Sequence, residues 1–82
     1  MSIKRFRKKP IEVEAVQWTG NNDDELWRFV GWENITWFGL VPGIETPEGN
    51  MMVSKGDWVI KDVQGECYPC KPDIFDETYE AV

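Results

Sequence analysis

The most informative part of the sequence for the fold is the run WVIKDVQGECY, residues 58–68. Residues 58–63 are rich in β-branched and other apolar side chains, which favour a strand, and Gln64-Gly65 is typical of a tight turn. Residues 66–68 are then expected to return as the second strand of a hairpin. Since strands joined by a tight turn run antiparallel, the sequence predicts a mainly antiparallel sheet.

A second hairpin is predicted earlier in the chain, over residues 44–53. Its turn is Pro47-Glu48-Gly49-Asn50, in which Pro fits the second turn position and Gly fits the position that needs a positive φ. The β-branched and aromatic residues at 35–41 predict a further strand, with Gly39 interpreted as a bulge. Pro42-Gly43 is interpreted as a break between that strand and the hairpin.

The N-terminal half predicts one strand followed by one helix. Residues 11–18 begin with alternating apolar and acidic side chains, the period of a half-buried strand. Asn22 and Glu25 have the spacing of a capping box, in which each side chain binds a free backbone N–H, and Gly31 is placed to end the helix. Three apolar residues share one face of this helix: Leu26, Phe29 and Val30.

The C-terminal part predicts a short helix and a last strand. Pro72 fits the first position of one or two helical turns, and residues 78–82 regain strand character that would close the sheet toward a small barrel. At 82 residues the chain is expected to form a single α+β domain, residues 1–82. The predicted architecture is a curled antiparallel sheet of five to six strands, or a small barrel, with one helix and a C-terminal helical turn.

Basic and acidic residues are separated along the chain, whose formal net charge is −6. From Glu12 onward, four basic residues face fifteen acidic ones, a formal balance of −11. We interpret residues 3–8 as the first half of an edge strand, with a basic arm that reaches for phosphate groups as the alternative. The other five basic residues all precede Pro10: Lys4, Arg5, Arg7, Lys8 and Lys9.

This charge separation bears on the class of partner. The acidic body should be repelled by nucleic acid, so direct nucleic-acid binding is not expected. An acidic domain can instead imitate nucleic acid toward a basic protein. No run of about 18 apolar residues and no apolar signal-peptide core is present, so we expect a cytoplasmic protein without a membrane span.

Cys67 and Cys70 have C-x-x-C spacing, which occurs in redox pairs and in half of a zinc site. With no histidine and no further cysteine, the chain lacks the other ligands of a structural zinc site, and two cysteines cannot build a disulfide framework. We therefore expect packing roles for both, no metal and no cofactor. A small domain that has neither disulfide bonds nor a structural metal is expected to self-associate.

The aromatic and basic residues near the hairpin over residues 58–68 form a candidate ligand site. Lys71 precedes Pro72 at a helix start with free backbone N–H groups, which favours anion binding. Stacking faces beside this positive charge suit a nucleotide-like small molecule, with ordinary turn chemistry as the alternative. The predicted ligand-binding residues are Lys55, Trp58, Tyr68, Lys71 and Asp73.

Five tryptophans are the most unusual feature of the composition. About three are expected in the core, whereas Trp27 lies off the apolar helix face and Trp32 follows Gly31. Trp27 and Trp32 are therefore predicted to be exposed and to form a partner interface. Carboxylates are abundant, but no arrangement of nucleophile, base and orienting group and no phosphate-binding loop is apparent, so we expect a protein that is not an enzyme.

Four segments of the chain resemble a group of small proteins encoded by bacteriophages and prophages. They are GDWVIK at 56–61, GECYPCKPDIF at 65–75, TYE at 78–80 and RKKPIEVEAVQWTG at 7–20. The resemblance implies a phage-encoded accessory protein in the cytoplasm of the host cell and carries over no catalytic residue.

In such a protein the ligand site would suggest counter-defence by sequestering a nucleotide-like immune signal, that is, binding without catalysis. The alternatives are an acidic inhibitor of a basic host protein and a structural or accessory phage component. The Gly-Asp-Trp stretch is also similar to the bacterial and viral PGDYG family, from which it departs at Lys55, Trp58 and Val59.

Overall fold

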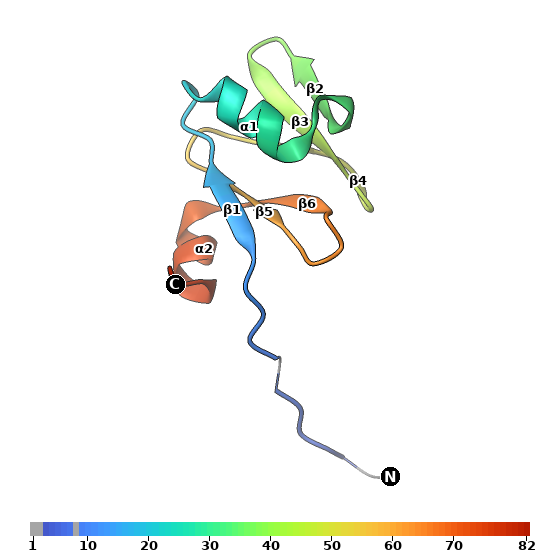
Figure 1. The fold of residues 1–82 in the computed structure, drawn as a ribbon, viewed down its shortest axis with the longest axis vertical. Helices are drawn as coiled ribbons and strands as arrows, with labels where there is room; N and C mark the ends of the chain where they lie inside the picture. Colours follow the sequence, from blue (N-terminus) through green and yellow to red (C-terminus); the bar gives the residue numbers. More distant parts are fainter. Residues whose placement is uncertain (1–2, 8) are drawn as a thin grey trace.

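The predicted hairpin near the C-terminus is confirmed and forms the centre of one sheet. In the computed structural model, which describes residues 3–7 and 9–82, strands β5 (Trp58–Lys61) and β6 (Cys67–Cys70) pair antiparallel. Strand β1 (Glu14–Gln17) pairs with the other edge of β5, in the order β1-β5-β6 (Figure 1).

The remaining strands form a second antiparallel sheet in the order β2-β3-β4. Its strands are β2 (Ile35–Phe38), β3 (Val41–Thr46) and β4 (Gly49–Met52). The described residues thus form two antiparallel three-stranded sheets and no closed barrel, so the predicted single sheet of five to six strands is matched only in part, whereas the α+β class is confirmed.

Two details of the second sheet correct the predictions. Gly39 is not a bulge: it has a φ of 67° and lies in the turn that joins β2 to β3. Pro42 is not a break but lies within β3, opposite Trp37. The carbonyl of Pro42 accepts a hydrogen bond from the N–H of Val53 at 2.9 Å. Because proline has no N–H, it cannot donate the second hydrogen bond of this pair, and the ladder with β4 ends at Met52.

Helix α1 (Asp23–Val30) begins and ends where the sequence predicts. Gly31 ends it with a φ of 93°, a conformation that favours glycine. The predicted capping box is wrong, because Asn22 binds side chains and the preceding loop instead: its Oδ1 accepts the N–H of Thr19 at 2.8 Å and its Nδ2 donates to Glu25 Oε1 at 2.8 Å. A 3₁₀ turn, η1 (Trp32–Asn34), leads into β2.

The two ends of the chain also differ from the predictions. Described residues 3–7 form no strand, and β1 begins only at Glu14 because its partner β5 ends opposite it at Lys61. Lys8 lies outside the described residues. The predicted last strand is wrong: helix α2 (Pro72–Thr78) takes up Thr78, and described residues 79–82 form no strand. Tyr79 instead packs on Phe75 at a ring distance of 5.1 Å.

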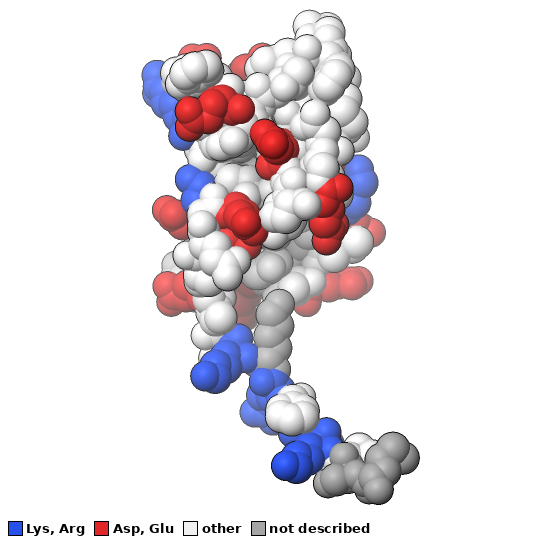
Figure 2. Space-filling model, turned by 90° about the vertical axis from the view of Figure 1, so that its right-hand side faces the viewer, with Lys and Arg blue, Asp and Glu red and all other residues white. Residues whose placement is uncertain are grey.

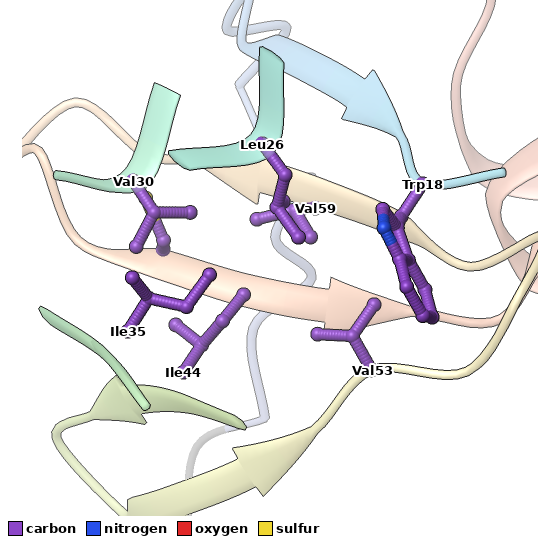
Figure 3. Packing of buried hydrophobic residues seen from close by; sticks show 8 residues of the cluster. Trp18, Leu26, Val30, Ile35, Ile44, Val53 and Val59 are labelled. Carbon is purple, nitrogen blue, oxygen red and sulfur yellow. The ribbon is translucent and has the colours of Figure 1, made fainter. Parts of the chain in front are cut away.

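The core lies between α1 and the two sheets, as Figure 3 shows. Leu26, Ile44, Val53 and Val59 are fully buried, and each contributes roughly 1.5–3 kcal/mol through removal from water. Residues from both sheets and from α1 therefore share one core, which makes the two sheets a single folding unit. The other members of the core are Trp18, Val30, Ile35 and Cys67.

Candidate functional site

Lys71, the centre of the predicted ligand site, is engaged within the protein. Its Nζ donates to Asp57 Oδ2 at 3.2 Å and to Oδ1 at 3.3 Å. The Asp57 side chain is 4% exposed and also accepts the N–H of Ser54 at 2.9 Å. The ammonium group therefore neutralises a buried carboxylate, and an anionic ligand would have to compete with Asp57 for it.

Trp58 is also engaged, through one face of its ring. It stacks on Phe75 with ring centroids 4.2 Å apart and an interplanar angle of 5°. Phe75 in turn packs on Tyr79, so this row of rings fastens α2 to β5. Trp58 pairs in register with Cys70, which places it at the same end of the hairpin as Lys71.

The other three predicted ligand residues have local contacts or lie in solvent. The Tyr68 hydroxyl donates to Glu66 Oε2 at 3.0 Å, a hydrogen bond that raises the pKa of Tyr68 to about 12. The Lys55 stem covers Gly20, where an added Cβ would lie 2.7 Å from Lys55 Cε. Asp73 is exposed in the first turn of α2. Ligand binding by the five residues stays a prediction.

The two cysteines are free thiols. Cys67 lies in the core, as the alternation of a strand predicts, and burial raises its pKa. Cys70 is half-buried and its Sγ lies 3.6 Å from the carbonyl oxygen of Lys71, with a pKa that burial also raises. Both shifts keep the thiols protonated at neutral pH, which lowers their nucleophilicity.

A different site lies between α1 and β2. Five residues line an open hollow of about 400 Å³, which we name the indole hollow: Asp23, Asp24, Trp27, Arg28 and Trp37. Two carboxylates and two indole rings therefore converge with one guanidinium on the same space. A second hollow, beside Cys67, has no indole ring in its lining.

One wall of the indole hollow is fixed by the core. The buried indole of Trp18 donates its Nε1–H to Asp23 Oδ1 at 2.9 Å. The same ring meets Trp37 edge to face, with centroids 6.3 Å apart. Since Trp18 is held by core packing, it orients one carboxylate and one indole of the hollow without a ligand.

The exposed residues of α1 leave the indole hollow open to water. Trp27 is 44% exposed, and Asp24 and Arg28 are exposed beside it on α1. Although Asp24 and Arg28 are four residues apart, the one ion pair within 4.0 Å among the described residues is that of Lys71 with Asp57. The Asp24 carboxylate is therefore free to bind a cation from outside the chain.

The sequence identified only part of this site. Trp27 and Trp32 are exposed as predicted, at 44% and 69%, but only Trp27 lines the indole hollow. In the sequence, Asp23 and Asp24 are ordinary acidic residues of a helix start, and Trp37 is one aromatic residue of the strand predicted at 35–41. The signal that identifies the helix side of the hollow is the i, i+4 spacing of Asp23 with Trp27 and of Asp24 with Arg28.

The outer face of the second sheet carries a separate apolar patch. Phe38 is paired with Val41, and Met52 is paired with Gly43, so these residues lie side by side. All three large side chains are at least 40% exposed. Phe38 and Met52 pack over Gly43, where an added Cβ would lie 2.8 Å from Phe38 Cε2 and 3.3 Å from Met52 Sδ.

Comparisons with models of protein families, with curated proteins and with solved structures found no match to this chain. Within the described residues, no helix has the length and hydropathy needed to cross a membrane. No three His, Cys, Asp or Glu side chains gather in this part of the chain in a way that could hold a metal ion.

Proposed function

We propose that this chain is a non-catalytic binding protein that receives a cationic segment of a basic protein in the indole hollow. The observation that carries the proposal is the convergence of Asp23, Asp24, Trp27 and Trp37 on one open space. A guanidinium or ammonium group is attracted by the face of an indole ring, by about 0.5–1 kcal/mol at exposed sites. Charge-assisted hydrogen bonds to a carboxylate add about 1.5–3 kcal/mol.

The charge of the body supports the same class of partner. From Glu12 onward acidic residues outnumber basic ones by eleven, and they are spread over the body in Figure 2. Such a field attracts a basic partner from a distance and repels acidic ones, and it acts mainly on the association rate. Exposed tryptophans supply the contact energy that surface charges lack.

The resemblance to phage and prophage proteins supports a host protein as the partner. In that setting the acidic body would imitate nucleic acid toward a host protein that normally binds it. Binding of a nucleotide-like ligand by Lys71 and Trp58 remains a prediction. However, the ammonium group of Lys71 is already bound by Asp57, and the ring of Trp58 is already stacked on Phe75. The indole hollow therefore gives the better supported function.

Titration of the full chain with a hexa-arginine peptide, followed by tryptophan fluorescence, tests the proposal. Asp24→Asn should weaken binding about fivefold, close to 1 kcal/mol, and Trp27→Ala should weaken it by a similar factor. Glu48→Gln removes the same charge from the exposed β3–β4 turn and should change the affinity much less.

The direction in which Arg28→Ala changes the binding affinity shows whether the hollow receives a cation or an anion. If the hollow receives cations, Arg28→Ala removes a repulsive charge and tightens hexa-arginine binding. If the hollow receives an anion that stacks on indole, the same change weakens binding of that anion. Hexa-arginine affinity that is unaffected by both Asp24→Asn and Trp27→Ala would refute the proposal. Nucleotide binding that Lys71→Ala abolishes would instead support the predicted ligand site at Lys71 and Trp58.

A further inference from the structure

The N-terminal segment is an unpartnered basic arm, residues 3–10, of which residue 8 lies outside the described part. Its described residues form no helix or strand, and Ile3 and Phe6 are 84% and 89% exposed. The arm extends away from the body, and cations gather on it in Figure 2. Large apolar side chains left in water on a cationic segment are typical of a segment that binds another surface.

The chemistry of the arm matches that of the indole hollow. The arm presents the guanidinium groups of Arg5 and Arg7, flanked by the ammonium groups of Lys4 and Lys9. Planar guanidinium groups stack on indole faces and form hydrogen bonds with carboxylates. The hollow offers both partners, and Phe6 adds an aromatic ring that can pack beside them.

The arm of one molecule does not lie near its own hollow. The chain enters β1 at the end of the sheet away from α1, so the arm and α1 lie at opposite ends of the molecule (Figure 1). Eight extended residues span about 26 Å at roughly 3.3 Å each, and the extended arm is part of the 52 Å length of the molecule. A second copy can receive the arm in its extended form, without the chain folding back.

We infer that the basic arm of one copy binds in the indole hollow of a second copy. This inference rests on the proposed function, because it names the chain itself as one source of the cationic segment. Since the arm and the hollow are at opposite ends, the contact is head-to-tail and can repeat from copy to copy. A basic host protein would then compete with the arm for the same hollow.

Sedimentation velocity on the untagged full chain tests the inference. The mean mass of the wild-type protein should rise with concentration at low salt and return to that of a monomer near about 0.5 M salt, where the screening length falls to a few ångströms. Two variants should each stay monomeric at low salt. One changes the arm, Lys4→Ser with Arg5→Ser, Arg7→Ser and Lys9→Ser, and the other changes the hollow, Asp24→Asn with Trp27→Ala.

Mixing the two variants is the decisive measurement. The intact hollow of the arm variant and the intact arm of the hollow variant should give dimers of one copy of each. A wild-type protein that stays monomeric at high micromolar concentration, or a hollow variant that still assembles, would overturn the inference. Hexa-arginine binding to a monomeric wild-type protein would leave the proposed function standing, whereas no hexa-arginine binding would remove both.

Discussion

Replacement of Lys71 by methionine separates a structural role of this residue from a ligand-binding role. The change keeps most of the side-chain stem and removes the ammonium group that binds Asp57 Oδ1 and Oδ2. The buried carboxylate then keeps the N–H of Ser54 but loses its cation. Since a carboxylate left without a cation in the interior is costly, the variant should be less stable than the wild type.

The exposure of the two side chains sets the magnitude. Loss of one partner from a fully buried ion pair costs about 3–5 kcal/mol, whereas an exposed pair contributes about 0–1 kcal/mol. Asp57 is 4% exposed and Lys71 is 59% exposed, so solvent screens the pair from one side. We expect a loss of about 1–2 kcal/mol, which lowers Tm by roughly 4–16 °C for a domain of this size.

Urea unfolding with a double-mutant cycle measures this loss. Asp57→Asn keeps an oxygen for the Ser54 N–H and removes the charge, so Lys71→Met should cost little in the Asp57→Asn background. Lys55→Met is the control for loss of a nearby exposed lysine. An unchanged or raised Tm in Lys71→Met would refute the reasoning, because residues that are kept for a ligand often cost stability.

Three further predictions concern the core, the outer sheet face and the hairpin. Leu26→Ala should lower the free energy of unfolding by about 2–5 kcal/mol in urea, since this fully buried side chain joins α1 to both sheets. Gly43→Ala should lower Tm, because its Cβ would meet Phe38, and Phe38→Ala should relieve that loss in the double variant. In an absorbance titration of the phenol groups, Tyr68 should ionise near pH 12, and Glu66→Gln should lower this pKa. The raised pKa stabilises the folded state below pH 10, and this contribution is lost as the pH rises through 12; a Tyr68 that titrates normally would contradict the hydrogen bond.

Local signals account for the parts of the fold that the sequence predicted. The turn at Gln64-Gly65, the helix end at Gly31 and the helix start at Pro72 each depend on the conformational preference of one or two residues. These preferences act within a few residues, so they can be identified without knowledge of the tertiary structure. Helix α1 and both hairpins were predicted for this reason.

The division into two sheets depends on contacts between distant residues, which local patterns do not report. Pro42 is tolerated inside β3 because Val53 lies opposite it and bonds to its carbonyl, a pairing across eleven positions of the chain. The predicted last strand is wrong because α2 includes Thr78, and Tyr79 packs on Phe75, which itself stacks on the distant Trp58. In both places the tertiary environment overrode the local preference.

The indole hollow was missed for a related reason, and Trp18 explains why. The ring of Trp18 belongs to the core, its N–H orients Asp23 and its edge supports Trp37. Each of these residues has an ordinary explanation by itself: an apolar core side chain, a helix-end acid and a strand aromatic. Only the packing of α1 against the second sheet turns them into one surface.

Because the same indole fills the core and positions the hollow, folding and preorganisation of the site are coupled. A cationic segment that binds there meets a carboxylate and a ring that core packing already orients, so less conformational entropy is lost on binding. Asp24, Trp27 and Arg28 lie on the exposed face of α1, where substitution changes binding without opening the core. This division of roles makes the sign of the Arg28→Ala effect a direct measure of which charge the hollow receives.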